Sequence, residues 1–144
     1  MKDYINPNDS KVCNDVKFGS VFALRVGYDC TYYEFYQVVG KTSKKLKVKE
    51  IKPEVIKPEH GFYLDTGGYI SVDNNNMATF KIPNSIIEND NKVILTFLYK
   101  EPDGGYHIKL NSSSRFYGGY AHLVNDETIR LWVNNNYWGP RETF

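Results

Sequence analysis

Short runs of alternating apolar and polar residues dominate the chain, and turn residues bound them. Such runs predict half-buried strands. The clearest are the tyrosine-rich run 32–39 and the lysine-rich run 45–51, which a short turn separates. We expect the two to form a hairpin with the lysines facing water. Leu46, Val48 and Ile51 could then share one face only if a bulge interrupts the end of the second run.

The other strand candidates follow the same pattern. They are residues 20–26, 69–72, 78–82, 93–99, 106–110, 116–123 and 128–133. The run 93–99 is apolar on both faces, which is typical of a central strand. Pro102-Asp103-Gly104-Gly105 predicts the turn of the hairpin that follows. Residues 83–88 could form one helical turn.

These elements predict an all-β fold of about seven to nine short antiparallel strands in a single domain. A small β-barrel or a sandwich would accommodate them, and we favour the barrel because short, glycine-kinked strands bend and close easily. Residues 1–17 are polar and are interpreted as an N-terminal arm. Residues 18–144 form the barrel-like domain, with an irregular insertion near 53–91 where prolines end the regular pattern.

The composition and net charge of the chain narrow the range of functions to be considered. The chain has 144 residues, enough to bury a core without metals or disulfides, and 15% of them are aromatic. Its formal net charge of +1 excludes a strongly basic duplex-binding protein and a strongly acidic nucleic-acid mimic. A nucleic-acid interface remains only as an alternative, through the lysine stripe of residues 44–49.

The two cysteines, Cys13 and Cys30, lack the spacing of a zinc site. No apolar run is long enough for a membrane-spanning helix, and residues 1–7 do not resemble a signal peptide. We therefore expect a soluble protein in the cytoplasm with reduced thiols and no membrane partner.

Two parts of the chain resemble a protein group. The segment Val21–Ile51, and later Ile108–Ser112, Tyr120–Leu123 and Ile129–Trp132, resemble small accessory proteins of phages and prophages of Gram-positive bacteria. The resemblance implies a phage origin and a cytoplasmic location in the infected host cell. It carries no catalytic residues. Accessory phage proteins of this size often act by sequestering or blocking, which makes a counter-defence role the implied expectation.

The residues themselves show no catalytic motif. His60, His107 and His122 are widely separated and match no metal-ligand or two-histidine spacing. There is no nucleophile elbow, no cysteine close to a histidine partner, and no glycine-rich phosphate loop. We therefore expect a protein that is not an enzyme and has no cofactor and no metal.

Arginine is scarce in a chain rich in lysine and asparagine, so each arginine is a candidate for a phosphate or carboxylate contact. The four are Arg25, Arg115, Arg130 and Arg141. Arg115 precedes Phe116, Tyr117 and Tyr120, a combination that suits a nucleotide with its phosphate on the guanidinium and its base on a ring. The alternative is a surface ion pair beside ordinary core aromatics.

A second aromatic cluster comprises Tyr28, Tyr32, Tyr33 and Tyr36. By alternation Tyr32 and Tyr36 share one strand face, and Tyr33 shares the other with Phe35. One face must be core. The other would be an exposed stripe suited to an interface, unless a thick barrel wall or an oligomer covers both faces.

The C-terminal Trp138 and Phe144 suggest docking on this chain or on a second copy, hence a homo-oligomer.

The favoured function is sequestration of a host nucleotide immune signal, either cyclic or of ADP-ribose type. The alternative is inhibition of a host defence nuclease or effector protein, in the manner of an anti-CRISPR. The candidate ligand residues are Arg115, Phe116, Tyr117, Tyr120, Arg25, Tyr28, Tyr32, Tyr36 and Arg130.

Overall fold

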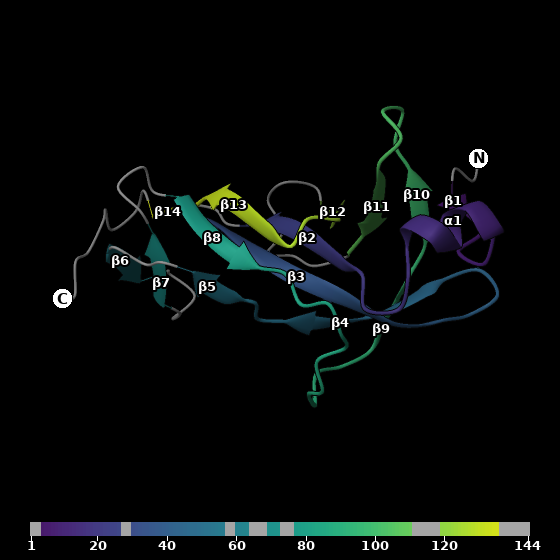
Figure 1. The fold of residues 1–144 in the computed structure, drawn as a ribbon, viewed down its shortest axis with the longest axis horizontal. Coiled ribbons are helices and arrows are strands. Elements are labelled where there is room, and N and C mark those ends of the chain that lie inside the picture. Colours follow the sequence, from purple (N-terminus) through teal and green to yellow (C-terminus); the bar gives the residue numbers. More distant parts are fainter. Residues whose placement is uncertain are drawn as a thin grey trace.

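The computed structural model describes residues 4–26, 30–56, 60–63, 69–72, 77–110 and 119–135. It confirms an all-β fold with one short helix (Figure 1). The elements are β1 (Tyr4–Ile5), α1 (Ser10–Asp15), β2 (Val21–Val26), β3 (Cys30–Lys41), β4 (Leu46–Ile51), β5 (Glu54–Ile56), β6 (His60–Tyr63), β7 (Tyr69–Val72), β8 (Met77–Lys81), β9 (Ile94–Thr96), β10 (Leu98–Lys100), β11 (Tyr106–Lys109), β12 (Tyr120–Val124), β13 (Thr128–Trp132) and β14 (Asn134–Asn135).

A curled antiparallel sheet forms the main layer. Its strands run in the order β1-β10-β11-β12-β2-β3-β4-β9, and β14 pairs with β3. The predicted hairpin of β3 and β4 is confirmed, and so is the hairpin of β10 and β11. Gly104 in the second turn has a φ of 95°, a left-handed conformation that glycine adopts without strain.

The segment that carries β9 and β10 gives the sheet its barrel-like curl. It was predicted as one central strand, but it divides at Phe97. Its first half pairs with β4 and its second half with β11 and β1, so one short segment belongs to both ends of the sheet. The Thr96 hydroxyl donates to the Lys109 carbonyl at 2.9 Å across this bend. Leu95 points outward and is 52% exposed, which a central strand would not allow.

The inside of the curl holds the first of two cores. Phe22, Leu24, Tyr36, Val48 and Ile108 are all almost completely buried there. The segment predicted to be an irregular arm contributes to this core, because α1 places Val12 against it and Val16 follows directly. The arm interpretation was therefore wrong for this part. Figure 1 shows α1 at one end of the sheet.

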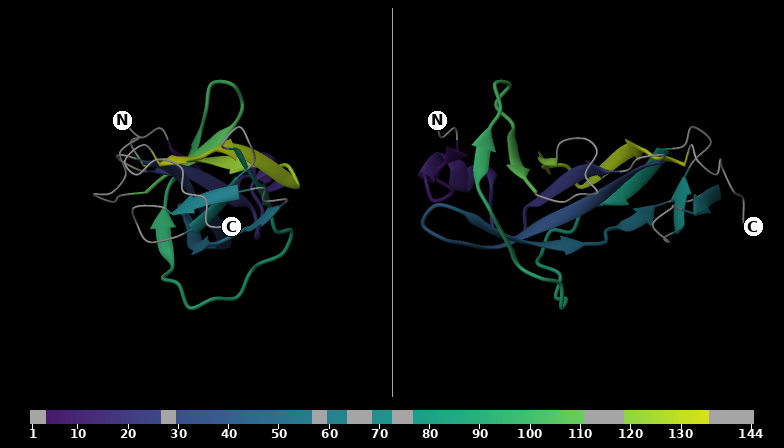
Figure 2. Two further views of the ribbon diagram at one scale, coloured as in Figure 1. Left: turned by 90° about the vertical axis from the view of Figure 1, so that its left-hand side faces the viewer. Right: turned by 180° about the vertical axis from the view of Figure 1, so that it is seen from behind.

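A second core lies on the outer face of β2 and β3. A three-stranded sheet of order β13-β8-β5 covers that face, as the end-on view in Figure 2 shows. Phe35 and Phe80 meet between the two sheets with ring centroids 4.8 Å apart. Ile51 also belongs to this outer core, whereas Leu46 and Val48 face inward. β4 has no bulge near Glu50, and the three residues accordingly do not share one face.

The insertion near 53–91 contains the strands β5, β6, β7 and β8. β5 and β8 build the covering sheet, and β6 pairs with β7. Residues 83–88 form no helical turn. The buried Gln37 side chain takes the hydrogen bonds that a turn would use, donating to the Ser85 carbonyl at 2.8 Å and accepting from the Ile87 amide at 2.9 Å.

Candidate functional site

A groove of about 670 Å³ opens on the outer face of the curled sheet, beside the covering sheet. We call it the Arg25 groove. It is lined by Ala23, Arg25, Tyr33, Glu101, His107, Tyr120, His122, Leu123, Val124, Ile129 and Leu131. Its volume lies within the range of small-molecule sites.

Strand alternation explains which side chains reach the groove. The even-numbered residues of β12 point outward, and the odd-numbered residues of β2 do the same on the neighbouring strand. Tyr120, His122, Ala23 and Arg25 therefore form the floor. Apolar side chains of β13 form one wall, and Glu101 lies at the β10–β11 hairpin on the other side.

Two histidines that are far apart in the sequence lie side by side on this floor. His107 of β11 is the direct partner of His122 of β12 in the ladder, and their ring centroids are 6.1 Å apart. His107 also stacks on Tyr99 at 5.1 Å and meets the edge of Tyr120 at 5.2 Å. These four rings make a continuous aromatic surface beside Arg25.

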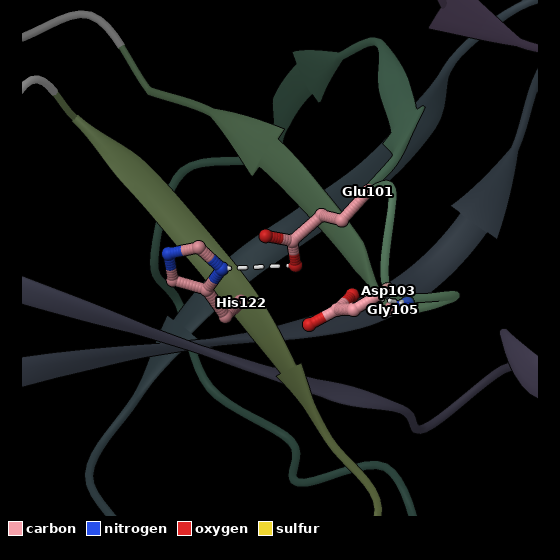
Figure 3. A network of polar contacts seen from close by, with 4 residues as sticks. All are labelled: Glu101, Asp103, Gly105 and His122. Atoms are coloured by element: carbon pink, nitrogen blue, oxygen red, sulfur yellow. Dashed lines mark hydrogen bonds and ion pairs between the residues drawn. The ribbon is translucent and has the colours of Figure 1, made fainter.

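Glu101 orients His122. Its Oε1 lies 3.1 Å from His122 Nδ1, as Figure 3 shows, and a carboxylate accepts a hydrogen bond here only from the ring form that has its proton on Nδ1. The pair is an ion pair when His122 is protonated. Asp103, whose carboxylate accepts from the Gly105 amide at 2.9 Å, comes from the same hairpin turn.

His107 has a different environment. Burial lowers the pKa of His107 below its usual range, the nearby His122 lowers it further, and Glu101 opposes both. Its Nδ1 is buried and has no hydrogen-bond partner among the described residues. At neutral pH the ring is therefore uncharged, and it serves as a flat aromatic surface more than as a cation.

The sequence-predicted residues divide into three groups. Arg25 and Tyr120 come together in the groove. Arg130 does not, because it lies on the opposite face of β13 from the lining residues Ile129 and Leu131. Tyr36 is 1% exposed in the inner core, with its hydroxyl donating to Glu34 at 2.7 Å, so it cannot belong to an exposed stripe. The remainder lie outside the residues or side chains that the structure describes, namely Arg115, Phe116, Tyr117, Tyr28 and Tyr32.

Sequence reasoning missed Tyr33, Glu101 and the histidine pair as site residues. Both faces of β3 are covered at Phe35 and Tyr36, in agreement with the alternative that neither face of this strand is exposed. Tyr33 lies beyond that covered region and reaches the groove. The hairpin turn and the alternation of 106–110 were both visible in the sequence. The pairing of that hairpin with β12 was not, and it is this pairing that aligns His107 with His122.

Metal chemistry finds no support in this arrangement. Across the described ranges, no three His, Cys, Asp or Glu side chains are grouped closely enough to hold an ion. Nor does any helix in those ranges have the length and apolarity to cross a membrane.

Comparisons with family models, with curated proteins and with solved structures found no match to this chain.

Proposed function

We propose that the protein binds a small nucleotide in the Arg25 groove and does not transform it. The observation that carries the proposal is the convergence of a guanidinium with aromatic faces in one open groove. Arg25 and Tyr33 are paired in register on β2 and β3, and Tyr120 lies on the next strand. Arginine grips phosphate through charge-assisted hydrogen bonds, and tyrosine rings stack on bases.

The remaining lining residues fit the same ligand. His122 presents its Nε2 as a donor to phosphate when protonated, and Glu101 keeps the ring oriented for it. Ile129 and Leu131 offer an apolar wall to the edge of a base or a ribose. A groove with an apolar wall and a few polar groups is typical of small-molecule sites.

In biological terms, we propose that the protein acts in the cytoplasm of an infected bacterium as a phage counter-defence protein that sequesters a host nucleotide signal. This step depends on the sequence resemblance. It predicts that expression of the protein protects phage from a defence system that signals through a nucleotide, and that Arg25→Gln removes the protection.

Calorimetry with AMP and ADP-ribose tests the binding directly. Loss of a charged contact costs about 1.5–3 kcal/mol, so Arg25→Gln should weaken binding at least about tenfold. Arg130→Gln is the matched control, since Arg130 is exposed outside the groove, and it should bind as the wild type does. Equal losses in both variants would contradict the site. A ligand recovered with a changed mass would contradict binding without turnover.

A second candidate is inhibition of a host protein, and one observation favours it. The Phe18 side chain is 63% exposed. Gln37 hydrogen-bonds both to Gly19, which follows Phe18, and to the segment that carries the exposed Ile86 and Ile87. These hydrogen bonds hold the two segments beside each other. Exposed apolar groups at one place are typical of protein interfaces. If this surface acts, Phe18→Ser should abolish phage protection while Arg25→Gln leaves it intact.

A further inference from the structure

The floor of the Arg25 groove carries an alternating row of cations and rings. Lys109 on β11 pairs in register with Tyr120 on β12, and Arg25 on β2 pairs with Tyr33 on β3. The pairing of Ala121 with Leu24 places Tyr120 beside Arg25, one position along the same ladder. Four neighbouring strands therefore present lysine, tyrosine, arginine and tyrosine in that order.

These four side chains share one face of the sheet. Arg25, Tyr33 and Tyr120 all line the groove. The Lys109 ammonium lies 5.7 Å from the centre of the Tyr120 ring, which continues the row beyond the groove floor. Tyr120 is 43% exposed, so its ring can receive a stacking partner.

The row of Lys109, Tyr120, Arg25 and Tyr33 is longer than one nucleotide can occupy. Adjacent strands lie about 4.8 Å apart, so the two tyrosines are separated by roughly 10 Å with Arg25 between them. One nucleotide uses one ring and one cation. The row provides two of each, in the order that a phosphodiester flanked by two bases would require.

We propose that the ligand of the groove is a dinucleotide, with one base on Tyr120, one on Tyr33 and the linking phosphodiester on Arg25. Lys109 then receives a terminal or second phosphate next to the first base. The inference rests on the proposed function, because it specifies which nucleotide the groove takes.

The same dinucleotide unit could belong to a free signal molecule or to a single strand of nucleic acid. The groove favours the free molecule. The apolar side chains of β13 line the groove beside the row, where a continuing strand would need further cations. A continuing strand needs an extended basic track, whereas the chain as a whole has a formal net charge of only +1.

Calorimetry with three adenine probes tests the proposal. The probes are AMP, the linear diadenylate with a 5′-phosphate, and the octaadenylate single strand. Diadenylate should bind at least about tenfold tighter than AMP, because a second stacked base and a second phosphate add contacts. Diadenylate and AMP of equal affinity would overturn the inference while leaving nucleotide binding intact. Absence of binding by both would overturn the inference and the proposed function together.

Two variants make the test independent of folding. Lys109 is exposed, so Lys109→Gln should fold normally and weaken diadenylate about fivefold or more. Tyr33→Leu keeps an apolar side chain against the outer core and should bring diadenylate close to AMP in affinity. Unchanged diadenylate binding in both variants would overturn the row as its site. Octaadenylate binding tighter than diadenylate would overturn the assignment to a free dinucleotide.

Discussion

His122 lies directly across the β11–β12 ladder from His107, with their ring centroids 6.1 Å apart at the floor of the Arg25 groove. The two rings differ in environment. His122 is exposed and held by Glu101, whereas His107 is packed between Tyr99 and Tyr120. His107 offers a neutral aromatic ring, and His122 offers a ring that Glu101 orients. This combination suits a ligand with a flat base and a charged phosphate.

The lowered pKa of His107 predicts how stability depends on pH. The unfolded chain takes up a proton at His107 near pH 6.5, but the folded chain does so only at a lower pH. The stability that comes from keeping His107 neutral is therefore complete above about pH 6.5 and is lost as pH falls through the folded pKa. Urea unfolding between pH 7.5 and pH 5 should show this decline, and His107→Phe should make it shallower. An equally steep decline in that variant would assign it to another group.

Hydrogen bonds from Gln37 hold the loop after β8 against the curled sheet. Its amide donates to the carbonyls of Gly19 at 3.1 Å and Ser85 at 2.8 Å, and its oxygen accepts from Ile87. Gln37→Leu keeps the volume but leaves these backbone groups without their partner, so we expect a loss of about 2–4 kcal/mol in the free energy of unfolding. Hydrogen exchange at the Ile87 amide should quicken in the same variant. Slow exchange there would show that the loop is held by other contacts.

Lys41 attaches the helical N-terminal segment to β3. Its ammonium donates to the carbonyls of Pro7 at 2.8 Å and Val16 at 3.0 Å, and it lies 3.4 Å from the Cys13 sulfur. Lys41→Met should lower the free energy of unfolding by about 1.5–3 kcal/mol. Lys44→Met is the matched control at an exposed position and should change it by less than about 0.5 kcal/mol. Similar values for the two variants would disprove the attachment.

Substitution of two glycines distinguishes the cost of backbone strain from the cost of a steric collision. Gly104 and Gly119 both have positive φ, at 95° and 74°. A Cβ on Gly104 meets nothing within 4 Å, whereas a Cβ on Gly119 collides with the Leu110 carbonyl oxygen. Gly104→Ala should cost about 1 kcal/mol in the free energy of unfolding, and Gly119→Ala at least about 2 kcal/mol more. Thermal unfolding of both variants checks this, and equal losses would argue against the close approach of β11 and β12.

Local patterns were enough to predict most strands. Alternation and turn residues located the β3–β4 and β10–β11 hairpins, because both depend on neighbouring residues. The covering sheet was not predictable in the same way. It pairs β8 with β13 on one side and with β5 on the other, across long stretches of chain. Only this second sheet explains why both faces of β3 are buried at Phe35 and Tyr36.

The site was predictable only in part for the same reason. The scarcity of arginine drew attention to Arg25, and the aromatic context drew attention to Tyr120. Their meeting depends on the β12–β2 ladder, which joins residues about a hundred positions apart in the sequence. Arg130 met the same sequence criterion but sits on the wrong face of β13, since one position along a strand reverses the side-chain direction.

The measurement that tests the central claim most directly is an amide NMR titration of the wild-type protein with AMP. We expect the largest shifts on β12, β2 and β3 around Tyr120, Arg25 and Tyr33, and we expect Arg25→Gln to abolish them at the same ligand concentration. Shifts that centre on Phe18 and Ile86 instead, or an unchanged response in Arg25→Gln, would contradict nucleotide binding in this groove.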